Sequence, residues 1–221
     1  MSDAGALLGK QIEVQLSGEK TFKGILTDLG MDILVLYNGE HFLYFPMLQV
    51  HRFNLSEEID SEIEYPLYSP MMEDMGSISY RKTLMNAKGM FSEMHIAGHI
   101  PLHGYITNVF NDYFAFYSPV YKTMYISLHH LKWLSPHNQG NIPYALSKEC
   151  FPVNPSAVPM VRSLGEQLKK YAGKLVVLDG GEDPIKIGVL KTAANNLVEL
   201  TTASGNQVFF KLAHIKSVYM P

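Results

Sequence analysis

The sequence predicts an all-β protein with short helices, built from three tandem five-stranded units, each a small and strongly bent barrel. The first observation is a segment bounded by two glycines 15 residues apart, which occurs three times. The second is that each second glycine is followed by an apolar strand, a turn, an aromatic strand and a short aliphatic segment. Self-similarity at a fixed period indicates copies of one supersecondary unit. The glycine pairs are Gly9 and Gly24, Gly89 and Gly104, and Gly173 and Gly188.

The first unit shows the strand pattern most clearly. Ile12, Val14 and Leu16 alternate with polar residues, which is the period of a half-buried strand. The second strand, 22–27, contains Gly24, and a glycine inside a strand marks a sharp bend or a close backbone approach. Three further strands are expected at 33–36, 42–45 and 50–53, with Asn38-Gly39 as a hairpin turn. Five short strands in so few residues indicate a small barrel.

The third unit follows the same plan and is preceded by a helix. Strands are expected at 187–192, 197–201, 208–210 and 215–219. Val161, Leu164, Leu168 and Tyr171 recur at helical spacing. A shorter helix is expected at 80–87, and residues 3–8 have room for one or two turns only.

Two connectors separate the units. Residues 56–77 are rich in Asp and Glu and contain no Lys or Arg, so we expect a solvated linker; packing across a barrel surface is the alternative. Residues 136–158 are rich in proline and predict a stiff, irregular spacer. Both are long for loops inside one compact domain, which favours separate barrels at 1–55, 78–135 and 159–221.

Composition excludes several classes of protein. The chain has 221 residues, a net charge of −3 and one cysteine, Cys150, so no intrachain disulfide forms and no general attraction to phosphate backbones is expected. The first residues lack the basic and apolar regions of a signal peptide, and no apolar run has the length of a membrane span. We therefore expect synthesis in the cytoplasm and no contact with a membrane.

The pattern of a leading helix and five bent strands, with glycine in the second, resembles the Sm-like barrel. It is most similar to the repeated domains of spore coat proteins of the coat protein B type. This resemblance rests on Gly180-Gly181-Glu182, Gly188-Val189-Leu190 and His214–Val218, with weaker echoes at His130–Leu134 and Gln49–Phe53. It implies a sporulation protein, made in the mother cell and placed in the bacterial spore coat with other coat proteins as partners. Such proteins can carry a long Ser/Lys/Arg-rich tail, whereas this sequence stops at Pro221.

An RNA-binding regulator of the Sm-like class is the alternative function. Asp28, Asp32 and Asn38 partly echo the residues with which such proteins read RNA. However, no turn before a last strand carries the basic-glycine element, and no Lys/Arg cluster supplies electrostatic attraction. The sequence therefore argues against nucleic acid as a partner.

Metal binding and catalysis have weaker support. His95, His99 and His103 are evenly spaced, but Gly98 and Pro101 argue against one continuous strand. The adjacent His129 and His130 point to opposite sides of an extended chain. Cys150 has no activating motif, and Gly180-Gly181 is predicted to be a hairpin turn, not a phosphate-binding loop. We expect no catalytic residue, metal ligand, cofactor or small-molecule substrate; a metal-dependent protein remains a third class to test.

Association through strand edges is the function that the sequence favours. In Sm-like rings the fourth strand of one unit pairs with the fifth strand of the next. Here the fourth strands are aromatic, and strand alternation sends half of their side chains to the core and leaves half for a neighbour. We expect the three barrels to dock edge to edge within the chain and to leave outer edges for self-association, and two chains would supply six barrels. The candidate edge residues are Phe42, Tyr44, Met124, Tyr125, Val208, Phe209 and Phe210.

Overall fold

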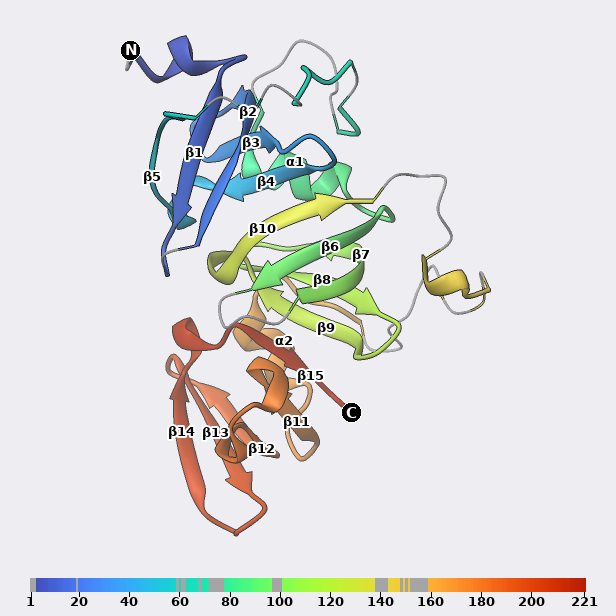
Figure 1. Cartoon of the computed structure of the whole chain (residues 1–221). Helices are drawn as coiled ribbons and strands as arrows, with labels where there is room; N and C mark the ends of the chain where they lie inside the picture. Colours follow the sequence, from blue (N-terminus) through green and yellow to red (C-terminus); the bar gives the residue numbers. More distant parts are fainter. Residues whose placement is uncertain are drawn as a thin grey trace.

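One strand order occurs three times in a single antiparallel sheet of 15 strands (Figure 1). The computed structural model describes residues 3–18, 20–58, 60, 63–67, 69–71, 78–96, 101–137, 143–147, 149, 151 and 159–221. Each set of five consecutive strands, called here units one, two and three, has the spatial order fourth, third, second, first, fifth. The prediction of an all-β protein with short helices is therefore confirmed.

The strands of unit one are β1 (Gln11–Leu16), β2 (Thr21–Leu29), β3 (Ile33–Tyr37), β4 (Phe42–Pro46) and β5 (Val50–Leu55). Those of unit two are β6 (Phe91–Ile96), β7 (Pro101–Val109), β8 (Tyr113–Ser118), β9 (Lys122–Ser127) and β10 (Leu131–Pro136). Those of unit three are β11 (Leu175–Leu178), β12 (Ile187–Ala194), β13 (Leu197–Thr202), β14 (Gln207–Lys211) and β15 (Ser217–Tyr219).

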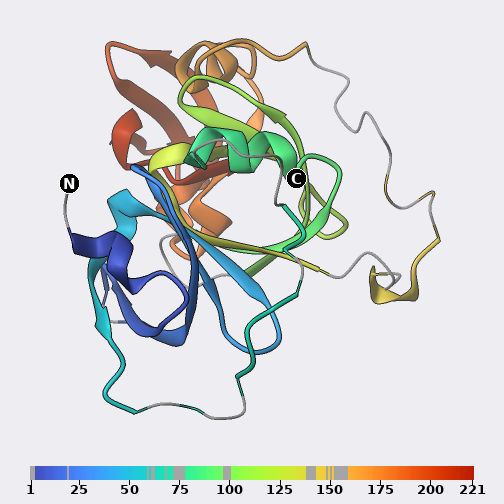
Figure 2. The same ribbon diagram turned by 90° about the horizontal axis from the view of Figure 1, so that it is seen from above.

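Short helices lie before each unit and before each fifth strand. Units two and three are preceded by the α-helices α1 (Tyr80–Asn86) and α2 (Leu164–Lys169), and unit one by a 3₁₀ helix, η1 (Asp3–Leu7). The turns before the fifth strands are η2 (Met47–Gln49), η3 (Leu128–His130) and η8 (Leu212–His214). Figure 2 shows η1, in dark blue, well apart from α1, in green. In the described residues, no helix is long and apolar enough to span a membrane.

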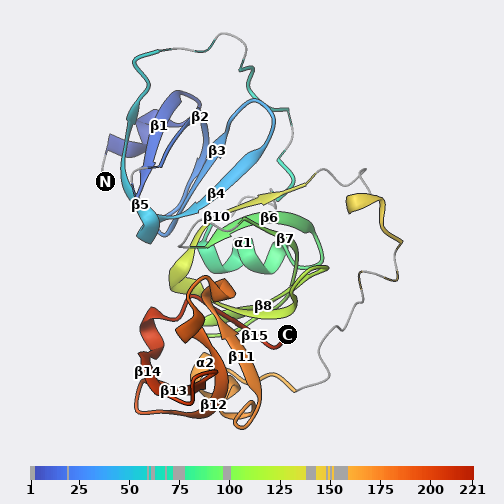
Figure 3. The same cartoon turned by 60° about the horizontal axis from the view of Figure 1, so that its bottom comes forward.

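The units are joined through their edge strands into one open sheet. The fourth and fifth strands of a unit do not pair with each other in this ladder. Instead, β10 of unit two pairs with β4 of unit one, and β15 of unit three pairs with β9 of unit two. This is the pairing of fourth with fifth strands that the sequence analysis expected within the chain. Figure 3 shows the three units following one another, in blue, green and orange to red.

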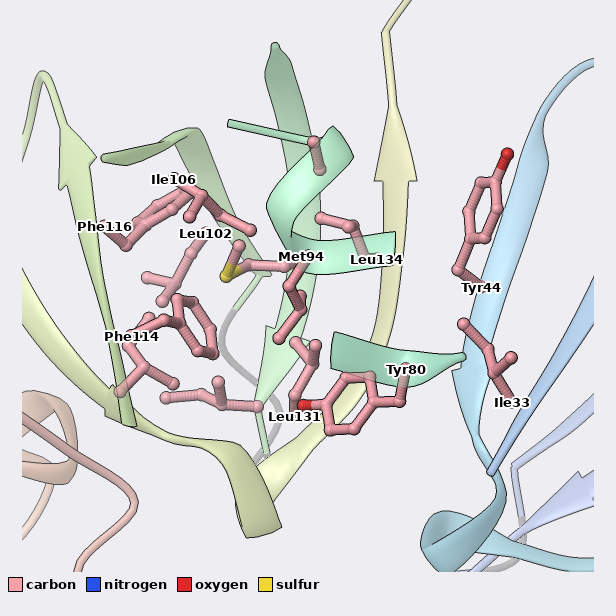
Figure 4. Packing of buried hydrophobic residues seen from close by; sticks show 14 of the residues in the cluster. Ile33, Tyr44, Tyr80, Met94, Leu102, Ile106, Phe114, Phe116, Leu131 and Leu134 are labelled. Carbon is pink, nitrogen blue, oxygen red and sulfur yellow. The ribbon is translucent and has the colours of Figure 1, made fainter. Parts of the chain in front are cut away.

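Strand alternation distributes the aromatic side chains between two cores. On β4, Leu43 and Phe45 belong to the core of unit one, whereas Phe42 and Tyr44 pack in the core of unit two. On β9, likewise, Tyr125 packs in the core of unit three. The cores of units two and three are thus each completed by side chains from the outer surface of the unit before. Figure 4 shows Ile33 and Tyr44 on the side of unit one that faces Tyr80 and Leu134.

The glycine in each second strand lies against backbone. A Cβ added to Gly24, Gly104 or Gly188 would lie 2.3, 1.9 or 2.5 Å from the carbonyl oxygen of the strand alongside. A side chain at any of these positions would therefore push two paired strands apart. The glycine that precedes each first strand has a different role, because it adopts a positive φ: 77° at Gly9, 75° at Gly89 and 80° at Gly173.

Gly180-Gly181 lies in the hairpin connection between the paired strands β11 and β12, as predicted. This connection is longer than a simple turn, because it contains two 3₁₀ turns, η6 (Asp179–Gly181) and η7 (Pro184–Lys186). Asp179 explains this longer connection: its carboxylate accepts a 2.7 Å hydrogen bond from the N–H of Lys216 and pairs with Lys186 at 2.8 Å.

The acidic connector is not entirely solvated. Met71 is buried in the core of unit two, and the Ser69 hydroxyl lies 3.1 Å from that of Tyr44. At these residues, packing across the surface, which was the alternative, is what the structure has. Cys150, Gly98 and His99 lie outside the described residues.

Candidate association face and edges

The two junctions between units share one register. Leu134 on β10 lies opposite Tyr44 on β4, and Val218 on β15 lies opposite Tyr125 on β9. Leu134 and Val218 occupy the same place in their fifth strands, as do Tyr44 and Tyr125 in their fourth strands. The protein therefore uses a single mode of joining twice.

A polar contact also recurs at the junctions. Gln49, just before β5, donates from Nε2 to the carbonyl oxygen of His129 at 2.5 Å. His130, just before β10, has its Nε2 2.9 Å from the carbonyl oxygen of Ala213. A carbonyl oxygen only accepts, so the imidazole donates this bond. In both cases the residue before one fifth strand binds the corresponding turn of the next unit.

An aspartate in each of the first two units caps the helix of the unit that follows. The carboxylate of Asp32 accepts a 2.8 Å hydrogen bond from the N–H of Tyr80, the first residue of α1. Asp112 does the same for Leu164, the first residue of α2, at 2.9 Å. Free N–H groups at a helix start favour such acceptors. Asp32, considered above as an RNA-reading residue, thus holds two units together.

The two other residues of the RNA echo also have local structural contacts. Asp28 accepts a hydrogen bond from the N–H of Leu29 at 2.8 Å. Asn38 accepts from the N–H groups of Glu40 and His41, at 3.1 and 2.8 Å, and so shapes the turn between β3 and β4. The structure does not bring these two side chains together with Asp32 into a described contact.

Burial at the junctions shifts the titration of several side chains. Burial, the largest cause, raises the pKa of Tyr80 and of Tyr171 well above the ordinary range, so both phenols stay neutral. Burial also lowers the pKa of Lys132, with Lys216 as a further cause. Lys132 donates to the carbonyl oxygen of Ser17 at 2.9 Å, from unit two to unit one. The side chains of Tyr80, Tyr171 and Lys132 are thus shielded from solvent to different degrees where the units meet.

Unit three presents the same surface without a unit to cover it. In each unit, the residue in the middle of the fourth strand pairs with one residue of the third strand. These pairs are Tyr44 with Val35 in unit one, Tyr125 with Ala115 in unit two and Phe209 with Glu199 in unit three. Phe209 is 59% exposed, whereas Tyr44 is 2% and Tyr125 0% exposed. The side chains that form this surface, called here the open face, are Leu197, Glu199, Phe209 and Lys211.

The other end of the sheet is open in a matching way. β5 and β14 are the two terminal strands of the ladder. Residues of β5 are exposed or half-buried, whereas those of β10, its counterpart in unit two, are almost all buried. Phe53 lies at the place on β5 that Leu134 has on β10, because each pairs with the middle of its first strand. Among the described residues, the sheet therefore ends at a fourth strand on one side and at a fifth strand on the other, each with one free edge.

The predicted edge residues separate into three groups. Phe42, Tyr44 and Tyr125 face the following unit within the chain. Met124 lies in the core of its own unit, and Phe210 packs against the core of unit three, beside the half-buried Val208. Among the seven, Phe209 alone is exposed. The structure brings His103 together with Glu93 and His137, two residues that spacing along one strand does not reveal. His95 lies on the same face as Glu93, and His99 lies outside the described residues.

Comparison with known proteins finds similarity along the whole chain. A family model described as the YwrJ third domain matches residues 163–218, which include α2 and most of unit three. The chain is 43% identical over 226 residues to a Bacillus subtilis (strain 168) protein named "Uncharacterized protein YwrJ", with 100% of both covered. No solved structure matches the chain significantly.

Proposed function

This chain belongs to the YwrJ family, and we propose that it is a non-enzymatic assembly protein. In this proposal the protein associates with copies of itself: the open face and β14 of one molecule bind β5 of the next. The observation that carries the proposal is the exposure of Phe209, at a position where both other units bury a tyrosine beneath the following unit. A large apolar side chain at an unpaired strand edge favours association.

The repeated junction specifies the geometry of this contact. Within the chain, Leu134 pairs with Tyr44 and Val218 pairs with Tyr125. If two molecules join in the same register, Phe53 of one molecule lies opposite Phe209 of the other. Continuing the polar contact places the side chain of His214 beside the carbonyl oxygen of Leu48 in that second molecule. The partner is therefore a second copy, since unit one carries the only unpaired fifth strand in the described ladder.

A contact between two different surfaces is heterologous and produces either a closed ring or a filament. Figures 1 and 3 both show β5 and β14 on the left side of the molecule, with unit two between them. This placement supports an arc of three units that a second chain closes. We infer that the units are of the Sm-like class, and that two chains supply the six units of a ring.

The resemblance to coat protein B-type repeats suggests where such an assembly acts. We propose that the protein is made in the mother cell and takes its place in the spore coat, where it contacts other coat proteins. This part of the proposal rests on the resemblance of Gly180-Gly181-Glu182 and His214–Val218 to those repeats. Fluorescent tagging of the chain in sporulating cells tests it directly: a ring of signal around the forespore supports it, and uniform signal in the mother cell contradicts it.

Light scattering coupled to size exclusion tests the self-association. We expect the mass of the wild type to grow from monomer to dimer or larger as its concentration rises. Phe209→Glu and Phe53→Glu should each remain monomeric, because each places a charge in the proposed contact. Lys191→Glu is the matched control, since Lys191 is an exposed position on β12 outside both edges. A monomeric wild type at high concentration would overturn the proposal, and growth only upon addition of a short RNA would favour the RNA-binding alternative.

A further inference from the structure

Unit two places three potential metal ligands on adjacent strands. Glu93 on β6 lies directly opposite His103 on β7 in the antiparallel ladder. On the other side of β6, Glu93 lies opposite Ser135 of β10, and His137 follows two residues later. The N–H of His137 donates to the carbonyl oxygen of Phe91 at 2.9 Å, which extends the pairing beyond the end of β10. Strand alternation then puts the three side chains on the same face of the sheet.

The three side chains converge closely enough to share one ion. One ligand atom from each of Glu93, His103 and His137 lies within 4.8 Å of the others, and all three residues are half-buried. Nε2 of His103 lies 3.8 Å from Oε2 of Glu93. A carboxylate and two imidazoles form a ligand set typical of zinc sites that keep an open position.

A fourth residue holds the carboxylate in place. His95, two residues after Glu93 on β6, has its Nε2 3.2 Å from Oε1, the other oxygen of the same carboxylate. The ring of His95 is itself fixed, since it stacks on Trp133 with 4.3 Å between ring centroids. A hydrogen bond to the second oxygen of a ligand carboxylate is the usual outer-shell support of a metal site.

Aromatic rings surround the histidines. Phe91 packs edge-on against His137, with 5.5 Å between centroids, and Tyr144 packs similarly against His103 at 6.1 Å. These rings restrict the imidazoles and exclude part of the solvent, which strengthens binding of a cation by the carboxylate. We propose that Glu93, His103 and His137 bind one divalent transition-metal ion, with Zn²⁺ as the best match, and that His95 positions Glu93.

Titration of the chelator-treated, dialysed full-length chain with Co²⁺ tests the site, because tetrahedral or five-coordinate Co²⁺ absorbs visible light. We expect saturation at one Co²⁺ per chain and displacement of the signal by Zn²⁺. His103→Gln and His137→Gln should each weaken binding at least about 100-fold, and His95→Phe, which keeps the ring on Trp133, by about 10-fold. His129→Gln is the control, since the His129 side chain is exposed in η3, at the opposite end of β10 from His137.

A second readout guards against variants that fail to fold. Zn²⁺ should raise the thermal unfolding midpoint of the wild type and of His129→Gln, but not that of His103→Gln, whose metal-free midpoint should equal that of the metal-free wild type. Absence of saturable Co²⁺ binding by the wild type would overturn the proposal. So would undiminished binding by folded His103→Gln and His137→Gln. Neither result bears on self-association, because the open face and β5 contain none of these residues.

Discussion

The hydroxyl groups of Tyr125 and Tyr171 form a hydrogen bond across the junction of units two and three. Tyr125 is on β9, and Tyr171 follows α2, so the bond joins a fourth strand to the helix segment of the next unit. Tyr171 also accepts a bond of 3.3 Å from Nε2 of Gln167, and all three side chains are buried. Buried hydroxyls that lose a partner are costly, so this network makes the junction specific.

We expect Tyr125→Phe and Tyr171→Phe each to lower the free energy of unfolding by about 1 to 3 kcal/mol, because each leaves a buried hydroxyl with one bond fewer. The double variant should lose less than the sum, since neither member of the pair remains. Urea unfolding of the four proteins measures this coupling, with the exposed Tyr65→Phe as control. Strictly additive losses would show that the hydroxyls do not interact.

Alkaline pH should destabilise the protein. Burial, with Tyr117 as the further cause, raises the pKa of Tyr105 from 10.0 to about 12. A phenol whose folded pKa lies above its unfolded pKa contributes stability that is complete below the unfolded value and is lost as the pH rises through the folded one. Burial of Tyr80, Tyr113 and Tyr171 shifts each pKa in the same direction.

The urea midpoint should therefore fall between pH 10 and pH 12, the interval that the pKa values of Tyr105 define. Phenolate absorbance in the ultraviolet should rise together with unfolding for these buried tyrosines. An unchanged midpoint across this interval, or full ionisation of every tyrosine in the folded protein near pH 10, would contradict the assignment.

The glycines of the second strands should not tolerate a methyl group. A Cβ at position 104 would lie 1.9 Å from the carbonyl oxygen of Tyr117 and 2.8 Å from Cζ of Phe116. We expect Gly104→Ala to cost about 3 kcal/mol or more. Gly5→Ala is the matched control, because nothing lies within 4 Å of its added Cβ and Gly5 has no positive φ. Equal stability of the two variants in thermal unfolding would contradict the close approach of β7 and β8 at Gly104.

The aspartate caps should contribute to both junctions by similar amounts. Asp32→Ala and Asp112→Ala each remove an acceptor for the first N–H of a helix, and we expect each to lower the free energy of unfolding by about 0.5 to 2 kcal/mol. Asp32→Asn and Asp112→Asn keep an acceptor oxygen and should recover most of that loss. If the asparagine variants were as unstable as the alanine variants, charge and not capping would explain the role of these residues.

Local patterns predicted the strand positions, whereas the resemblance to Sm-like rings predicted the way the units join. Alternation of Ile12, Val14 and Leu16, and the recurring glycines, each arise within a few residues of chain, so strand positions and bends were accessible from the sequence. The pairing of each fifth strand with the fourth strand of the preceding unit was expected from the resemblance and not from local patterns, because it depends on contacts between residues as distant as Tyr44 and Leu134.

The metal cluster was missed for the same physical reason. Even spacing along the chain directed attention to His95 and His103, whereas the ligand set includes Glu93 and the distant His137. These residues meet only because β6 pairs with both β7 and β10. By contrast, Phe209 was one of the predicted edge residues on the fourth strands, although its exposure required the structure.

Disulfide trapping between Phe53 and Phe209 tests the central claim most directly. In a Cys150→Ser background, Phe53→Cys and Phe209→Cys proteins are mixed and mildly oxidised, and covalent dimers are measured by non-reducing electrophoresis. Directly opposed residues on antiparallel strands have Cβ atoms close enough for a disulfide. We predict rapid formation of the mixed dimer, and little when Lys191→Cys replaces Phe209→Cys. Equal yields from the two pairings would contradict the continuation of the strand register from one molecule to the next.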